Sequence, residues 1–298
     1  MGLGETASLL AAFLWALASL FYGKTQLSAF AMNFGKNLIA SAVMLTHLRI
    51  ESFLTGRPMF GVGVTECGWL AVSGFVGIVI GDTFYFRSLQ ILGPRRALMV
   101  STTSPIFAAL LSWAFLSESV GSMDLIGITL TLTGVSFVVA DRRLNTEAPG
   151  LFPGSVSRGI LFGLLGAICT GIGAITSKVV MGHTNPLEAA LIRILASAVC
   201  TTALVATSGT LRKSISGLFQ SAQLKYFVPA VLCGTWLGIW LSQVGYKYSS
   251  VAVALTLTHT TPLFVMPMIR IVYGIRITLL AVAGAAIAIL GVYLTTVD

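Results

Sequence analysis

The sequence predicts an all-α membrane protein in which ten transmembrane helices form two inverted five-helix repeats. Three observations lead to this fold class. The 298-residue chain is 56% hydrophobic and 9% charged, with a mean hydropathy of +0.92, whereas about 25% of the residues of a soluble domain are charged. Its apolar residues gather in long segments, and about 20 such residues are enough to cross a bilayer as a helix. The third observation is an internal repeat.

The internal repeat pairs residues that lie 157 positions apart, without gaps. The matched positions are Gly77 with Gly234, Gly81 with Gly238, Ala97-Leu98 with Ala254-Leu255, Thr103-x-Pro105-x-Phe107 with Thr260-x-Pro262-x-Phe264, Gly127 with Gly284, and Gly134-Val135 with Gly291-Val292. Upstream, Ala40-Ser41-Ala42-Val43 recurs at an offset of 156. These matches indicate that the chain is two copies of one apolar unit.

In the first repeat, residues 1–141, we expect spans at about 5–23, 29–48, 66–87, 95–115 and 122–140, each an apolar run flanked by basic or polar residues. Residues 142–157 form a polar, Gly- and Pro-rich linker. The second repeat, residues 158–298, has spans at about 158–179, 186–207, 225–246, 251–271 and 277–297. Because five spans is an odd number, the second copy enters the membrane from the opposite side, which makes the repeat inverted.

Charge and composition exclude several classes of function. The net charge of +8 is typical of nucleic-acid binding as well, but here the basic residues flank apolar runs, which favours a membrane protein. The four cysteines show no metal-ligand spacing and are interpreted as small packing residues. We find no nucleophile paired with a base, no phosphate-binding loop and no metal cluster. The sequence therefore predicts neither an enzyme nor a cofactor or metal site.

Asp82 is the sharpest candidate for a functional residue. It lies inside the third span, and its repeat counterpart is Ile239, so the fold does not require an acid there. A carboxylate inside a membrane is costly and usually faces a cavity or a partner. Such a group suits proton binding and release. The alternatives are a structural pair with Arg87 or another cation, and a position close to the water interface.

Two cations fall inside spans at nearly equivalent positions. Lys36 lies in the second span and Arg193 in the seventh, where Arg193 matches Asn37 at the offset of 156. Buried cations could hold a carboxylate or phosphate of a solute, or could neutralise Asp82. The structural alternative is a long side chain that extends to the membrane surface.

Pro105 and Pro262 are expected to break the fourth and ninth spans near their middle, because proline removes an intrahelical hydrogen bond. The residues before them are polar, and Ser101, Thr102, Thr258 and His259 are candidates to line a solute cavity. A matched pair of broken helices is the best pointer to a transport site that a sequence offers. The alternative is that these hydroxyl groups bond to their own backbone.

Amphipathic side chains on the first, third and eighth spans are further candidates for the cavity: Trp15, Tyr85, Trp236, Trp240, Gln243 and Tyr246. They could stack against an organic solute, or could anchor span ends at the membrane surface.

Glycines spaced seven residues apart in the fifth and tenth spans give each of these helices a small face for close packing. The partner of that face is either another helix of the same chain or a second copy.

The stretch from Ser88 to Val135 resembles the EamA-type branch of the drug/metabolite transporter superfamily. The resemblance is carried by Ala97-Leu98, by Ser104-Pro105-Ile106-Phe107-Ala108-Ala109-Leu110-Leu111, by Phe115-Leu116-Ser117-Glu118-Ser119 and by the following glycine helix. In the second copy Ile275 replaces the glutamate that Glu118 matches. The resemblance implies ten helices, a central cavity between the halves, transport of small metabolites that is often export, and frequent use of a proton gradient. Members commonly have cytoplasmic termini.

We therefore expect a secondary transporter, an exporter of a small organic metabolite such as an amino acid, in a bacterial cytoplasmic membrane. Its expected partners are the lipid bilayer, the solute and protons, and not nucleic acid. Within transport, an exporter of drugs or organic cations is the alternative, because one membrane acid near aromatic rings suits a cation. A membrane scaffold or receptor subunit is the alternative outside transport, and it would need neither matched broken helices nor an intramembrane acid.

Overall fold

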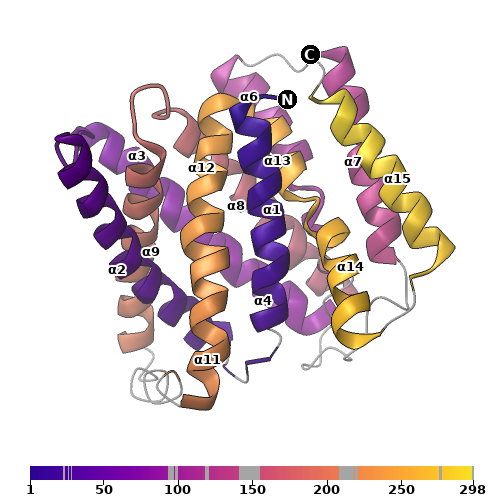
Figure 1. Cartoon of the computed structure of the whole chain (residues 1–298), viewed down its shortest axis with the longest axis horizontal. Coiled ribbons are helices and arrows are strands. Elements are labelled where there is room, and N and C mark those ends of the chain that lie inside the picture. Colours follow the sequence, from indigo (N-terminus) through magenta and orange to yellow (C-terminus); the bar gives the residue numbers. More distant parts are fainter. Residues whose placement is uncertain are drawn as a thin grey trace.

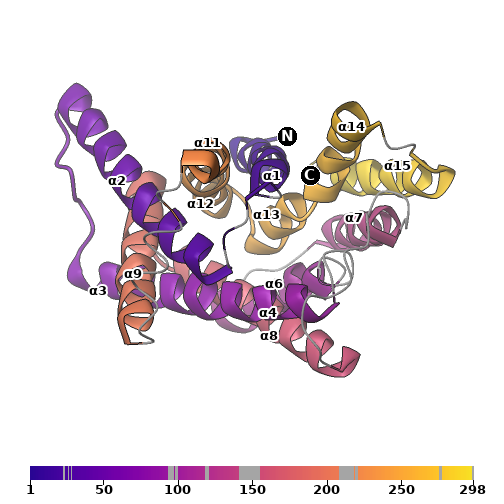
Figure 2. The ribbon, with the colours of Figure 1, turned by 90° about the horizontal axis from the view of Figure 1, so that it is seen from below.

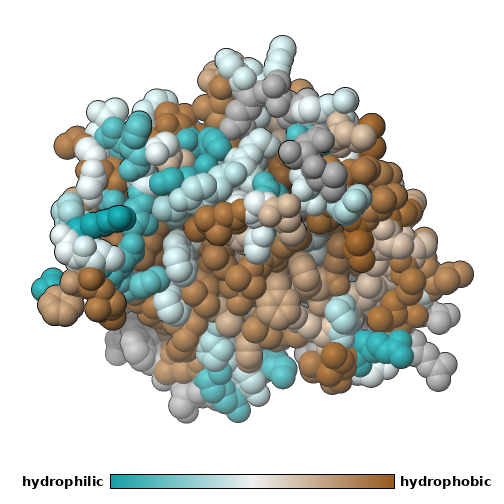
Figure 3. Space-filling view, turned by 45° about the horizontal axis from the view of Figure 1, so that its top comes forward, coloured by the Kyte–Doolittle hydropathy of each residue, from teal (hydrophilic) through white to brown (hydrophobic). Residues whose placement is uncertain are grey.

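A computed structural model describes residues 1–22, 24–25, 27, 29–92, 97, 100–117, 121–140, 155–207, 218, 221–274 and 277–296. The described residues form a bundle of helices, and both termini lie at the same end of it (Figure 1). In Figure 3 an apolar band crosses the middle of the visible face, and hydrophilic residues gather above and below the band. This distribution fits a protein whose waist is surrounded by lipid.

The first repeat supplies five spans. They are α1 (Leu3–Tyr22), α2 (Ala29–Thr55), the consecutive helices α3 (Val64–Gly74), η1 (Phe75–Ile80) and α4 (Gly81–Leu92), then α6 (Ser104–Leu116) and α7 (Ser122–Ala140). The second span extends seven residues further than the expected 29–48, because the helix continues past the charged residues Arg49 and Glu51 as far as Thr55. His47 therefore lies well inside α2 and not at its end.

The second repeat has the same order of spans. It consists of α8 (Val156–Lys178), α9 (Pro186–Thr207), the consecutive helices α11 (Ser221–Ala230), η2 (Val231–Leu237) and α12 (Gly238–Tyr248), then α13 (Val251–Thr258), α14 (Thr261–Tyr273) and α15 (Leu279–Leu294). Among the described residues, eight helical segments are long and apolar enough to cross a membrane, and two shorter apolar helices are α6 and α15. The predicted fold of two five-helix repeats is confirmed.

The two repeats are interlocked and not merely adjacent. α1 packs against η2 and α12 of the second repeat, and its counterpart α8 packs against η1 and α4 of the first. α2 packs against α9, and α7 against α15. Figure 2 shows α1 and α12 side by side, with α4 and α8 on the opposite side of the molecule. Each third span is thus held by the first span of the other repeat.

The third and eighth spans each contain a π-helical turn, and the two turns occupy matching positions of the repeat. Gly81 directly follows η1 and Gly238 directly follows η2. A π-helix places an extra residue in a turn, which disturbs the regular hydrogen-bond ladder and often marks a functional site. Trp15 of α1 donates its Nε1–H to the carbonyl oxygen of Gly234 inside η2, at 2.8 Å. One of the two π-helical turns is therefore anchored by a side chain of the other repeat.

The glycine faces of the fifth and tenth spans meet inside the chain. A Cβ atom on Gly127 would lie 2.7 Å from the carbonyl oxygen of Gly291, and one on Gly284 would lie 2.7 Å from that of Gly134. The backbones of α7 and α15 are consequently in direct contact. This resolves the alternative left open by the sequence, because a second copy is not needed to cover these faces.

Candidate functional site

An ion pair between α2 and α4 is the centre of the candidate site. Lys36 Nζ lies 2.7 Å from Asp82 Oδ2, and the two side chains are 14% and 31% exposed. Asp82 occupies the turn that directly follows η1. Of the partners considered for this acid, the structure places Lys36 beside it.

Other polar groups of the spans surround this pair. Tyr22 of α1 is within electrostatic range of both charges, and its hydroxyl lies 3.4 Å from that of Thr235 in η2. Tyr85 and Arg193 are within electrostatic range of Asp82. The structure thus brings together four of the residues predicted from the sequence, Lys36, Asp82, Tyr85 and Arg193, on α2, α4 and α9.

Arg193 is held by contacts between backbones. A Cβ atom on Gly74 would overlap the carbonyl oxygen of Arg193, and Ser197 donates to the carbonyl oxygen of Gly74 at 3.1 Å. α9 therefore lies directly on the junction of α3 and η1. The guanidinium group then reaches Gly77, whose added Cβ would be 3.5 Å from Nη2. Arg193 is 7% exposed, so a cation is buried at this helix crossing.

Gln243 lies on a neighbouring face and is fully buried. Its Oε1 accepts a hydrogen bond from Ser177 of α8. Tyr246 stands one turn further along α12 and is within electrostatic range of Arg193. Side chains of α8, α9 and α12 thus continue the polar region beyond the ion pair.

The fourth and ninth spans are interrupted at matching positions. α6 begins at Ser104 and α14 at Thr261, with Pro105 and Pro262 in their first turns, where the missing N–H of proline costs no helical hydrogen bond. The hydroxyls of Thr258 and Thr260 each donate to a carbonyl oxygen three residues earlier. For these residues the structure shows local bonding to the backbone, and Thr102 is buried.

His259 connects the two interruptions. Its Nδ1 lies 2.8 Å from the carbonyl oxygen of Leu255, and its ring also lies close to the backbone of Ser101. Ser101 belongs to the fourth span and His259 to the ninth. The candidate residues at the two breaks therefore meet across the boundary between the repeats.

Trp236 contacts a residue that sequence reasoning missed. Its Nε1 lies 3.3 Å from His47 Nδ1, and the His47 ring also packs edge-on against Trp240, with centroids 5.0 Å apart. His47 was missed because the second span was expected to end at residue 48. Its repeat counterpart Ala203 offers no polar group, so symmetry gave no signal either.

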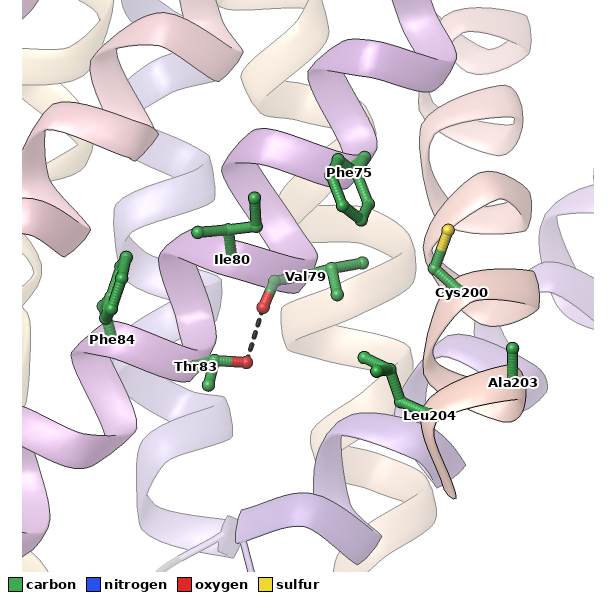
Figure 4. A pocket seen from close by; sticks show the side chains of 8 residues that line it. All are labelled: Phe75, Val79, Ile80, Thr83, Phe84, Cys200, Ala203 and Leu204. Atoms are coloured by element: carbon green, nitrogen blue, oxygen red, sulfur yellow. Dashed lines mark hydrogen bonds between the residues drawn. The ribbon is translucent and has the colours of Figure 1, made fainter. Parts of the chain in front are cut away.

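Two lateral pockets lie at pseudo-equivalent positions. One, of about 420 Å³, lies between η1 and α4, which contribute Val79 among others, and α9, which contributes Cys200, Ala203 and Leu204 (Figure 4). The other, of about 500 Å³, is lined by α2 and by Trp236 of η2. Val79 and Ala203 correspond to Trp236 and His47 in the repeat. Neither pocket is lined by Lys36 or Asp82, so they are apolar grooves on the sides of the bundle and separate from the ion pair.

Glu118, the candidate that matches the glutamate of the family, lies outside the described residues.

Known proteins with similar sequences and structures agree with this architecture. The chain is 27% identical over 291 residues to an uncharacterized transporter of Archaeoglobus fulgidus (strain ATCC 49558 / DSM 4304 / JCM 9628 / NBRC 100126 / VC-16), a match that covers 96% of this chain and 95% of the relative. A solved crystal structure shares its fold with a TM-score of 0.75, at 17% identity, covering 98% of this chain and 96% of the other. The model of the EamA-like transporter family matches twice, at residues 2–140 and 157–297. The chain therefore belongs to the EamA-like transporter family and is a membrane transporter.

Proposed function

We propose that this transporter is a secondary exporter of a small organic metabolite, such as an amino acid, and that Asp82 couples export to protons. The observation that carries the proposal is the ion pair of Lys36 with Asp82 inside the membrane-spanning helices. The membrane that we propose is the cytoplasmic membrane of a bacterium, across which a proton gradient is available.

The ion pair supplies a physical basis for coupling. While Asp82 is charged, each member compensates the cost of placing the other among apolar helices. A proton on Asp82 removes this compensation and leaves Lys36 as an unpaired cation. The two protonation states consequently favour different positions of α2, which packs on α9, relative to α4, which packs on α8. Alternating access needs two arrangements of this kind, and the proton biases their equilibrium.

The solute site proposed here lies between the repeats, next to the ion pair and the two helix breaks. Tyr85, Ser101 and His259 are partly exposed within the bundle and would contact the solute. The residues at the breaks offer backbone and hydroxyl groups at the depth where transporters commonly bind their substrates.

Export of an organic cation is the second candidate. It is favoured by Tyr22 and Tyr85 lying within electrostatic range of Asp82, because an acid near aromatic residues suits an ammonium group. In that case the cation would replace Lys36 at Asp82. Metabolite export is preferred because Lys36 already provides the cation that Asp82 needs.

The test uses purified protein in liposomes, with a pH gradient and a panel of radiolabelled amino acids and organic cations. We expect Asp82→Asn to abolish accumulation driven by the gradient while leaving exchange between the two sides measurable. Lys36→Gln should lower thermal stability, because it leaves a carboxylate unpaired, and the double variant should recover that stability without recovering the coupling. Glu66→Gln, which neutralises an acid near the start of α3, is the control and should behave as the wild type.

Two results would count against the proposal. Proton-driven transport at the normal rate by a folded Asp82→Asn protein would remove Asp82 from the coupling step. Failure of the wild-type protein to move any member of the panel would remove the proposed solute classes.

A further inference from the structure

We propose that Arg193 and Gln243 form a subsite for a carboxylate, so that the solute is an anion or a zwitterion. The inference deepens the function proposed above and names a substrate class for it. It rests on two buried hydrogen-bond donors, one of them charged, whose positions are fixed by the helix packing.

The first donor is the guanidinium group of Arg193. The residue is 7% exposed, and among the residues that the structure describes its Nε has no hydrogen-bond partner. Asp82, the acid within electrostatic range, is already paired with Lys36. A buried donor of a charged group that lacks a hydrogen-bond partner lowers the stability of a fold. Retaining an arginine there is understandable if an anion binds to it during the transport cycle.

The second donor is the amide of Gln243. The side chain is 0% exposed; its Oε1 accepts from Ser177, whereas Nε2 has no partner among the described residues. The acceptor of this amide is thus used and the donor is left over. Arg193 and Gln243 therefore lack the same thing, a hydrogen-bond acceptor.

Helix packing places these donors in one region. The guanidinium group reaches Gly77 of η1, and a Cβ on Gly173 of α8 would lie 2.8 Å from the Cα of Gly77. Ser177, the partner of Gln243, is one turn along α8 from Gly173. Tyr246, one turn along α12 from Gln243, is within electrostatic range of Arg193. The two residues thus lie on helices that pack together, because α12 contacts α8 and α9, and both α8 and α9 contact η1.

The chemistry of the two donors favours a carboxylate. The planar fork of a guanidinium group matches the two oxygens of a carboxylate, and a neutral amide donor adds a further bond without adding charge. The repeat does not supply a second copy of this site, since Asn37 corresponds to Arg193 and Phe86 to Gln243. A solute would therefore bind in one orientation, with its carboxylate toward the second repeat.

The experiment measures thermal unfolding of the full-length protein in lipid nanodiscs. The probes are matched carboxylates and carboxamides: lactate with lactamide, benzoate with benzamide, and N-acetylalanine with its amide. Sodium chloride and sodium phosphate at equal ionic strength are the inorganic arms. We expect the carboxylates to raise the unfolding temperature of the wild-type protein, while the amides and the inorganic salts do not.

Four variants test the residues. Arg193→Met should unfold at a higher temperature than the wild type without ligand, because it removes a buried charge whose Nε has no partner among the described residues, and it should lose the shift caused by carboxylates. Arg193→Lys should keep a weakened shift. Gln243→Leu should weaken the apparent affinity roughly tenfold, as expected for one lost hydrogen bond. Arg49→Met, which removes an exposed cation of α2, is the control and should change neither property.

Several outcomes would overturn the inference. The inference fails if no carboxylate raises the unfolding temperature, or if the matching amide, phosphate or chloride raises it as much. It also fails if carboxylates raise the unfolding temperature of Arg193→Met as they do that of the wild type. A ligand-free Arg193→Met protein that unfolds at a lower temperature would identify Arg193 as a structural residue. Transport of neutral solutes without any preference for carboxylates would reject this subsite and leave the proposed function standing. Carboxylate binding without any transport would support the subsite and reject the proposed function.

Discussion

At the scale of single residues, charge compensation distinguishes the two cations inside the spans. Lys36 has a carboxylate 2.7 Å away, whereas Nε of Arg193 has no partner within the described ranges. Both positions are costly in a membrane, but the costs differ in kind. A proton on Asp82 can break the pair, and an anion can bind to the Nε donor of Arg193 that lacks a partner. These residues therefore suit two separate tasks, coupling and recognition.

His259 gives a prediction at the same scale. Its Nδ1 lies 2.8 Å from the carbonyl oxygen of Leu255, and its ring also lies close to the backbone of Ser101, so one side chain contacts both the fourth and the ninth span. In His259→Gln the side-chain amide nitrogen can occupy the position of Nε2, the ring nitrogen farther from the backbone. In His259→Asn the shorter side chain places it only at the position of Nδ1. We expect the asparagine variant to lose about 0.5–1.5 kcal/mol of stability and to transport more slowly, and the glutamine variant to resemble the wild type.

The measurements for His259 are thermal unfolding and initial transport rates in liposomes. His183→Asn, an exposed histidine between α8 and α9, is the matched control and should have no effect. Equal behaviour of the asparagine and glutamine variants would show that the contact with Ser101 contributes nothing.

At the scale of elements, the backbone contact of α7 with α15 explains the glycine spacing and can be tested. A Cβ on Gly134 would overlap backbone atoms of Gly284 and Ala288, whereas one on Gly68 in α3 would meet no atom within 4 Å. We expect Gly134→Ala to destabilise the protein by about 1–3 kcal/mol through overpacking. Gly68→Ala should instead stabilise it by about 0.5–1 kcal/mol, because alanine is the better helix former. Thermal unfolding of both variants is the measurement, and a Gly134→Ala protein as stable as Gly68→Ala would contradict the packing described here.

The elements also show what a sequence can and cannot reveal. The ten spans and both interruptions could be predicted, because hydropathy reports burial in lipid and proline reports a local break. The π-helical turns η1 and η2 could not, since Phe75–Ile80 and Val231–Leu237 are apolar runs like any other helix. Lys36 and Asp82 were both candidates, but their pairing depends on the rotation of α2 against α4. That rotation is set by packing between helices that are distant in the chain, which no local pattern encodes.

At the scale of the whole molecule, interlocking makes the two repeats one unit. α1 and α8 each pack against the third span of the other repeat, and His259 adds a contact between the two breaks. Both clamps include a hydrogen bond: Trp15 donates to the carbonyl oxygen of Gly234 in η2, and Ser73, close to the end of α3, donates to the carbonyl oxygen of Gly173 in α8. The first span of each repeat is therefore hydrogen-bonded to the third span of the other.

The orientation of this unit in the membrane is the last prediction, and charge gives the direction. Of the 18 lysines and arginines, two lie within spans, Lys36 and Arg193. Four lie on the side of the membrane where both termini are expected: Arg49, Arg57, Lys178 and Lys247. The remaining twelve lie on the opposite side. The positive-inside rule places the twelve in the cytoplasm and the termini outside. Family members commonly have cytoplasmic termini, but an inverted repeat tolerates either orientation because its halves are alike when flipped.

The two ends of α8 allow a direct test of the orientation, since Ser155 precedes this helix and His183 follows it. With the four native cysteines replaced, a cysteine at position 155 should resist an impermeant maleimide in intact cells and one at 183 should react, while both should react after permeabilisation. The reverse labelling in intact cells would show that the family orientation, and not the charge bias, governs this chain.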